Sequence, residues 1–94
     1  MKVRKLPLEI LYKLSRQDAI LLALAMSGPM TRDEIAKAIE EMTGIKMKVV
    51  YLHRMMPALT RDGYIRICCK RGKKYVYEIT PMGIRLLRRL GLVR

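Results

Sequence analysis

The sequence contains no phenylalanine, no tryptophan and no asparagine, and it has one histidine and two cysteines, which are adjacent. A single histidine with no cysteine at metal-ligand spacing excludes the usual zinc sites and the usual pairs of nucleophile and base. No glycine-rich loop follows a predicted strand, so the common cradle for a nucleotide phosphate is missing too. We therefore expect a protein that is not an enzyme and that needs neither a metal nor a cofactor.

Long apolar runs are also missing. The longest run, residues 19–26, has eight residues, whereas a membrane-spanning helix needs about 20. Residues 1–5 are basic, but the segment after them lacks the small-residue cleavage site of a secretory signal. The adjacent Cys68 and Cys69 provide no disulfide framework, which favours a reducing compartment. These absences predict a cytoplasmic protein with no membrane partner.

The chain has 94 residues, of which 51% are hydrophobic and 30% are charged. This composition supports a real core and predicts a single folded domain spanning residues 1–94, with no disordered polybasic tail. Thermolabile amides are scarce and charges are many, which favours a thermophilic source, although eight methionines argue against it. We also expect the source to be archaeal.

Acidic residues are few, at 8 against 20 lysines and arginines, so the net charge is +12. The surplus is not spread evenly: residues 1–41 carry a net charge of +1 and residues 42–94 a net charge of +11. A generally solvated charged surface would have similar numbers of positive and negative charges in both halves of the chain. The asymmetry predicts that the second half binds a polyanion, with nucleic acid as the first candidate.

Four helices are predicted in the first two thirds of the chain. The first covers residues 7–14, with Pro7 at a position where its missing N–H costs nothing. Capping boxes, Ser15 with Asp18 and Thr31 with Glu34, start helices that end near residues 26 and 43. A further helix covers residues 48–62, where Pro57 removes one backbone hydrogen bond and predicts a kink.

The period of the pattern then changes from helical to extended. Residues 64–70 alternate, which predicts a strand with Ile65, Ile67 and Cys69 on its inner face. A four-residue basic turn, residues 71–74, leads into a second strand over residues 75–79. Thr80 and Pro81 then begin a final helix over residues 81–90.

Three helices, a hairpin and a closing helix follow the order of a winged helix-turn-helix. The segments Asp62-Gly63-Tyr64-Ile65 and Thr80-Pro81-Met82-Gly83 carry the resemblance, together with the leucine-rich helix before the first of them. In these segments the chain resembles the MarR- and PadR-like regulators. The resemblance implies an α+β, mostly α fold, with a three-helix core, a β-hairpin wing and flanking terminal helices. It also implies a DNA-binding regulator of transcription.

In such a fold the helix over residues 48–62 enters the major groove of double-stranded DNA. Arg54 is our candidate for reading guanine, because a planar guanidinium matches both guanine acceptors, while the lysines before the helix suit phosphates. Tyr51 either reaches the DNA or is a half-buried aromatic. Val49 and the leucine and methionine stripe after it should face the core. The candidate contacts here are Lys46, Lys48, Tyr51, His53 and Arg54.

The wing supplies the second group of candidate contacts. Its tip, within residues 70–75, has no acidic residue beside it in the sequence and suits a minor groove or a phosphate backbone. We expect the preceding strand to support the tip with two outward cations. The candidate contacts of the wing are Arg66, Lys70, Arg71, Lys73 and Lys74.

The two ends of the chain are rich in leucine, more than one small core needs. We therefore expect a two-fold homodimer through the helices at residues 7–14 and 81–90. Two alternatives remain open for the function: a protein-interaction module with an acidic partner, or an architectural chromatin protein without sequence specificity. RNA binding is a weaker third, because the sequence lacks the interleaved aromatics that stack single-stranded bases. Cys68 is a thiol sensor, a cross-link between two chains, or a half-buried small residue.

Overall fold

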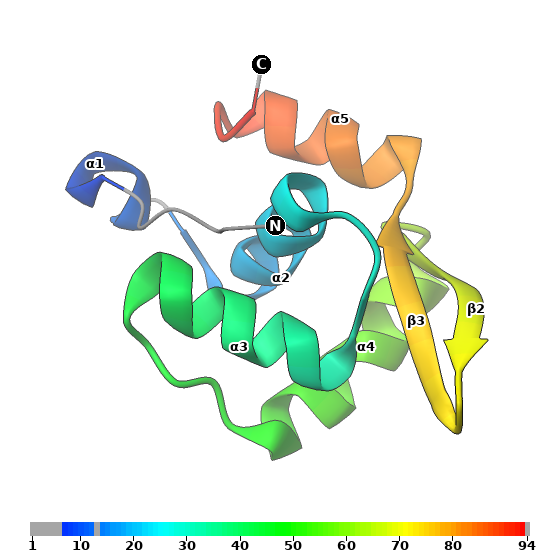
Figure 1. Cartoon of the computed structure of the whole chain (residues 1–94). Coiled ribbons are helices and arrows are strands. Elements are labelled where there is room, and N and C mark those ends of the chain that lie inside the picture. Colours follow the sequence, from blue (N-terminus) through cyan, green and yellow to red (C-terminus); the bar gives the residue numbers. More distant parts are fainter. Residues whose placement is uncertain (1–6, 13, 94) are drawn as a thin grey trace.

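The computed structural model describes residues 7–12 and 14–93. Helices dominate, and one small antiparallel sheet lies at one side of the molecule (Figure 1). The elements in chain order are α1 (Leu8–Leu11), α2 (Arg16–Ser27), β1 (Met30–Thr31), α3 (Arg32–Thr43), α4 (Val49–Arg61), β2 (Ile65–Arg71), β3 (Lys74–Ile79) and α5 (Pro81–Arg89). The predicted helices and strands occur in the predicted order, and one short strand, β1, is present in addition.

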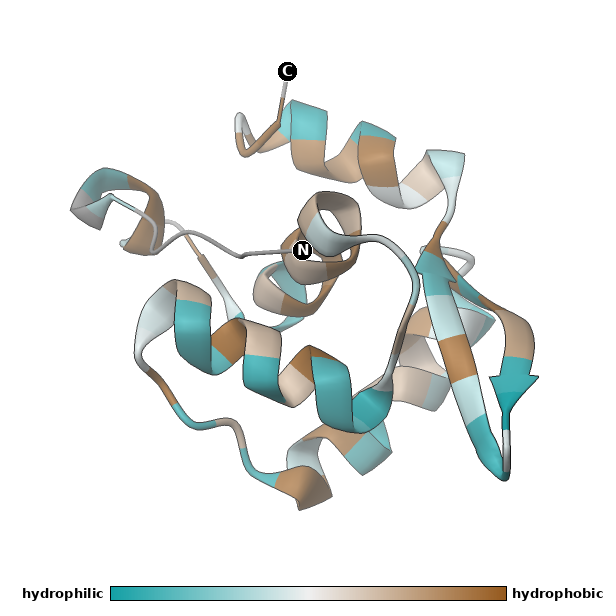
Figure 2. Cartoon of the chain, viewed as in Figure 1, coloured by the Kyte–Doolittle hydropathy of each residue, from teal (hydrophilic) through white to brown (hydrophobic). Residues whose placement is uncertain are grey.

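Helix α2 is the centre of the core. Six consecutive residues, from Ala19 to Leu24, are buried, so the helix is covered on every side. The apolar faces of α3, α4 and α5 turn toward it, as the hydropathy colouring shows for α3 and α5 (Figure 2). A helix that is apolar all round is stable only when neighbours surround it, which is the arrangement found here.

Side-chain caps fix where three of the helices begin. The side chains of Ser15 and Thr31 each accept a hydrogen bond from the backbone N–H three residues later. In return, the carboxylates of Asp18 and Glu34 accept from the backbone N–H of Ser15 and Thr31, so both predicted capping boxes are confirmed. Thr80 caps α5 in the same way by accepting from the N–H of Gly83. Helix α4 differs, because its N-cap residue is a lysine without a side-chain hydrogen bond.

The sheet contains one more strand than the sequence predicts. β1 pairs antiparallel with β3, which gives the strand order β1-β3-β2. The two strands β2 and β3 are joined by a two-residue turn rather than the predicted four-residue turn, because Arg71 and Lys74 are themselves paired. Gly72 has a φ of 65° at the first turn position, which is the conformation that this tight hairpin turn requires.

The prediction that Ile67 and Cys69 lie on a buried face of β2 is wrong. Only Ile65 of this strand is buried, and Ile67 is 44% exposed. Ile67 pairs with Tyr77 and Cys69 with Val76, so Cys68 is an extra, bulged residue that breaks the alternation. The sequence pattern has no signal for this bulge, because the residues around it still alternate.

Two predictions about the helices also need correction. The first helix covers Leu8–Leu11 rather than residues 7–14, of which residue 13 lies outside the described residues. Helix α4 covers Val49–Arg61, close to the predicted residues 48–62, and continues through Pro57. Val49, predicted to face the core, is 60% exposed, because the first turn of α4 extends past the core that Leu52 and Met56 enter.

The C-terminal segment folds onto the core of the same chain. Leu87 is fully buried, and Leu86, Leu92 and Val93 pack against the core cluster. Gly83 permits this docking: a Cβ there would overlap the carbonyl oxygen of Tyr64. Much of the apolar surplus that predicted a dimer is therefore used inside one chain.

Candidate nucleic-acid interface

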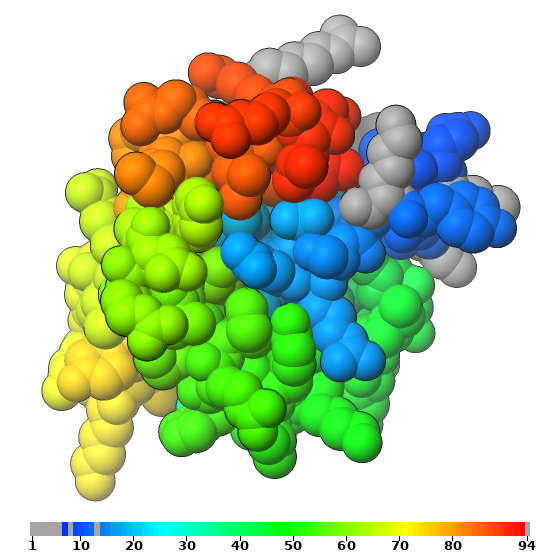
Figure 3. All heavy atoms as spheres, turned by 180° about the vertical axis from the view of Figure 1, so that it is seen from behind, coloured from blue at the N-terminus to red at the C-terminus, as the bar shows by residue number. Residues whose placement is uncertain are grey.

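The start of α4 and the tip of the β2–β3 hairpin lie at the same end of the molecule. In Figure 1 both reach the lower end, and the view from behind in Figure 3 shows the green start of α4 and the yellow hairpin tip at that end again. The sequence-predicted site residues lie in or next to these two segments, except Arg66, which pairs with Glu78 at the opposite end of the hairpin from the turn. The molecule thus presents a helix start and a hairpin tip in one direction.

The start of α4 carries cations without counter-charges. Lys46, Lys48 and Arg54 are exposed, and no ion pair or hydrogen bond to their side chains is found within the described residues. Residues 42–61 include no aspartate or glutamate. Tyr51 is half-buried against the core, with the guanidinium of Arg16 5.2 Å from its ring centroid. Of its two interpretations, the half-buried aromatic describes its position.

Arg32 is a residue that the sequence analysis missed. Its Nη1 lies 2.7 Å from Nδ1 of His53, and this bond links the start of α3 to the exposed face of α4. A guanidinium only donates hydrogen bonds, so Nδ1 accepts, and the proton of the neutral imidazole lies on Nε2. His53 itself is exposed. The hydrogen bond therefore holds the ring in one tautomer, in which the remaining nitrogen, Nε2, carries a proton and can donate a hydrogen bond.

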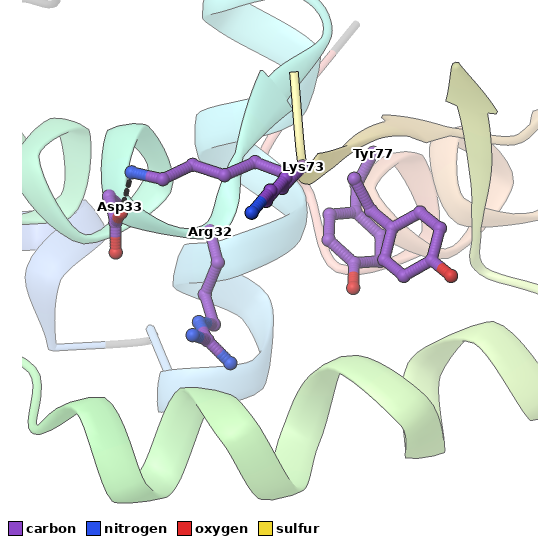
Figure 4. A pocket seen from close by; sticks show the side chains of 6 residues that line it. Arg32, Asp33, Lys73 and Tyr77 are labelled. Carbon is purple, nitrogen blue, oxygen red and sulfur yellow. Dashed lines mark hydrogen bonds and ion pairs between the residues drawn. The ribbon is translucent and has the colours of Figure 1, made fainter. Parts of the chain in front are cut away.

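A cavity of about 170 Å³ lies between the start of α3 and β3. Figure 4 shows Arg32 extending toward α4, with Lys73 and Tyr77 on the strand side of the cavity. Three of the residues around it are cations and one is an anion. The lining is formed by Arg32, Asp33, Lys73, Lys74, Tyr75 and Tyr77.

The hairpin tip does have acidic partners, contrary to the prediction. Nη1 of Arg71 lies 2.9 Å from Oε1 of Glu34, and Nζ of Lys74 lies 2.6 Å from Oδ2 of Asp33. We call these two ion pairs the wing latch, because they join the hairpin tip to the first turn of α3. Both carboxylates come from that turn, 37 and 41 residues before their partners.

The latch lowers the pKa of both carboxyl groups. The hydrogen bond and the positive charge of Lys74 hold the pKa of Asp33 below its ordinary value of 3.8. The backbone N–H of Thr31 is the main cause for Glu34, whose pKa lies below 4.5, and Arg71 adds to the effect. Both groups are therefore charged at neutral pH and keep their partners engaged.

The two supporting cations on the hairpin also have partners. Nε of Arg66 lies 2.5 Å from Oε1 of Glu78, and Nζ of Lys70 lies 4.9 Å from the ring centroid of Tyr75. Among the five predicted hairpin contacts, Lys73 alone has no partner within the described residues. The unengaged positive charge of the hairpin is thus concentrated at one tip residue.

The bulge in β2 gives the adjacent cysteines an unusual arrangement. Successive side chains of a regular strand point to opposite faces, yet Sγ of Cys68 and Sγ of Cys69 lie 3.3 Å apart. Both cysteines are exposed, so the interpretation of Cys68 as a half-buried residue is wrong. The hydrogen bond with Cys69 raises the pKa of the Cys68 thiol above 9.0.

In residues 7–12 and 14–93 there is no group of three or more histidine, cysteine or acidic side chains placed to bind a metal ion. None of the helices in the described part of the chain is long and apolar enough to cross a membrane.

A solved structure with a similar fold is that of F93 from STIV, a winged-helix DNA-binding protein. The TM-score is 0.70, the sequence identity is 18%, and the match covers 92% of this chain and 88% of the other. No protein-family model matches this chain, and no curated protein matches it either. The likeness shows a winged-helix fold, α+β and mostly α, in which the β2–β3 hairpin is the wing.

Proposed function

We propose that this winged-helix chain binds double-stranded DNA, with α4 in the major groove and the wing on the backbone or in the minor groove. The observation that carries the proposal is the position of Lys46, Lys48, Arg54 and Lys73 on two segments at one end of the molecule, where none of them has a partner among the described residues. F93, which shares the fold, is described as a DNA-binding protein, which supports the same partner here.

The side chains on α4 have different roles in the proposal. The planar guanidinium of Arg54 donates two parallel hydrogen bonds to the N7 and O6 acceptors of guanine. Lys46 and Lys48, as point charges before the helix, contact phosphates and fix its register. His53 presents its Nε2–H, which donates to a base acceptor or to a phosphate oxygen.

The wing contributes charge without sequence information. Lys73 and Arg32 line the same cavity, and a backbone phosphate at its mouth would be close to both. Because the latch uses the charge of Arg71 and Lys74, these two residues shape the wing and contribute less to binding.

The proposal extends to the assembly and the role of the protein. A two-fold dimer would place two copies of α4 in half-sites about one helical turn apart, roughly 34 Å. Exposed apolar side chains on the two terminal segments, Tyr12, Met82 and Leu90, support such an interface. In this proposal the protein is a non-enzymatic transcriptional regulator that acts in the cytoplasm.

The test is a titration of fluorescent duplexes at several salt concentrations, followed by selection from random duplexes. We expect affinity to fall steeply with salt, with a slope of about −0.9 for each phosphate neutralised. We expect R54A to lose discrimination between the selected and random duplexes, and K73A to weaken both equally. R85A on α5 is the matched control and should leave both unchanged. Duplex binding no tighter than that of a scrambled polybasic peptide would contradict the proposal.

A further inference from the structure

Three aliphatic side chains project from the connection between α3 and α4 and from the first turn of α4. Ile45 is 63% exposed, Val49 is 60% exposed and Val50 is 69% exposed. Single exposed apolar residues are ordinary, but these three lie within six residues of the chain, and we call them the apolar tip. The core in this region is closed by Met47 and Leu52, so the apolar tip is not part of it.

The helical repeat sets the valines beside the polar candidates. Side chains four residues apart are neighbours on a helix, so Val49 lies next to His53, and Val50 lies next to Arg54. Each valine and the hydrogen-bond donor four residues after it thus form one row along the exposed face of α4. Valine is stiff at χ1 in a helix, so little side-chain freedom is lost when it makes a contact.

The charges around the apolar tip decide what kind of partner fits it. Lys46 and Lys48 flank it, Arg54 follows it, and none of the three has a partner within the described residues. An apolar protein surface would leave these cations without counter-charges. A duplex supplies phosphates for the cations, and its major groove contains one apolar group on the base edges, the C5-methyl of thymine.

We infer that the apolar tip of Ile45, Val49 and Val50 reads thymine methyl groups in the major groove. This inference rests on the proposed function and adds the base type to it. The two rows predict a mixed site, in which Arg54 contacts guanine while Val50 contacts the methyl group of a neighbouring thymine.

The experiment replaces thymine by uracil, which removes only the methyl group. In a duplex selected from the random pool, we expect uracil at one or two positions to weaken binding about fourfold each, from the burial of one methyl group. The V49A/V50A double variant should bind the thymine and uracil duplexes equally. Alanine suits an exposed helix position, so this variant should remain folded, which its thermal unfolding checks. M26A, which removes an exposed apolar side chain from α2, is the matched control and should keep the thymine preference.

The outcomes separate the two proposals. Normal, salt-dependent binding with no thymine–uracil difference at any position overturns the methyl-reading inference and leaves DNA binding intact. Selection that enriches no sequence overturns it too, because a methyl-reading surface would enrich thymine. A V49A/V50A variant that changes the sedimentation coefficient but keeps the thymine preference assigns the apolar tip to a second copy and also overturns it. Absence of duplex binding removes the proposed function itself.

Discussion

Nη1 of Arg32 lies 2.7 Å from Nδ1 of His53, and this hydrogen bond joins the first turn of α3 to the exposed face of α4. The Nε of Arg32 is buried and has no hydrogen-bond partner in the described part of the chain. Burial of Nε and the hydrogen bond to His53 therefore fix the position of the guanidinium. Arg32 also lines the cavity that Lys73 lines, so its positive charge lies beside that cavity.

The first prediction concerns this pair. Replacing Arg32 by methionine should release the ring of His53, so that its proton distributes between Nδ1 and Nε2. A long-range nitrogen–proton NMR spectrum measures the tautomers, and the signals are assigned without ambiguity because the chain has one histidine. R61M, at the far end of α4, is the control and should keep the Nε2–H form. An R32M spectrum identical to that of the wild type would show that Arg32 does not fix the ring.

The second prediction concerns the wing latch and pH. The pKa values of Asp33 and Glu34 are lower in the folded chain than the ordinary values of 3.8 and 4.5. The two ionised carboxylates therefore stabilise the folded chain fully at a pH above their ordinary pKa values. This stabilisation is lost as the pH falls through the lowered pKa values. Urea unfolding across the acidic range should show this loss, and the D33N/E34Q variant should show a smaller one.

Both latch carboxylates are exposed, so water screens them and the expected loss is modest. The control for the latch is E41Q, which removes an exposed carboxylate from the same helix without touching the wing. Equal acid sensitivity of the D33N/E34Q variant and the wild type would mean that the latch does not contribute to stability.

The third prediction concerns Gly83. A Cβ at this position would overlap the carbonyl oxygen of Tyr64 and lie 2.6 Å from Cγ1 of Ile79. Backbone cannot move aside as a flexible side chain does, so G83A should destabilise the fold by about 3 kcal/mol. Chemical denaturation measures the effect, and R85A on the exposed face of α5 should change stability little. Wild-type stability of G83A would show that α5 is free to shift away from the hairpin.

The fourth prediction concerns Pro57, which is exposed in the middle of α4. Proline cannot donate to the carbonyl four residues earlier and costs about 3 kcal/mol in a helix interior. Part of this cost is offset because proline restricts the unfolded chain by about 0.4–1 kcal/mol. P57A should therefore raise the free energy of unfolding by about 2 kcal/mol. P29A, in the turn after α2, should lower it slightly, and a loss of stability in P57A would refute the argument.

Local features were predictable from the sequence, because short-range contacts decide them. The caps at Ser15, Thr31 and Thr80 depend on groups three residues apart, and each predicted cap is present. The order of helices and strands follows from the change of hydrophobic period. In contrast, the bond from Arg32 to His53 spans 21 residues and the latch spans 37 and 41, so no local pattern predicts them.

The predictions that failed have physical causes as well. Val49 has the same helical phase as Leu52, Met56 and Leu59, yet it lies one turn beyond the end of the core. β1 has two residues, too few for an alternating pattern, and only its partner β3 reveals it. The sequence does contain a signal for Arg32, which is a cation directly before two carboxylates at a helix start.

The short strand β1 couples parts of the molecule that otherwise look separate. Thr31 pairs with Val76 of the wing, caps α3 through its hydroxyl, and is itself buried. Thr31 therefore belongs both to the sheet that carries the wing and to the N-terminus of α3. In the proposed complex, the distance between α4 in the major groove and the wing is therefore fixed by the protein. The duplex must then adapt its curvature and groove width so that both elements make contact.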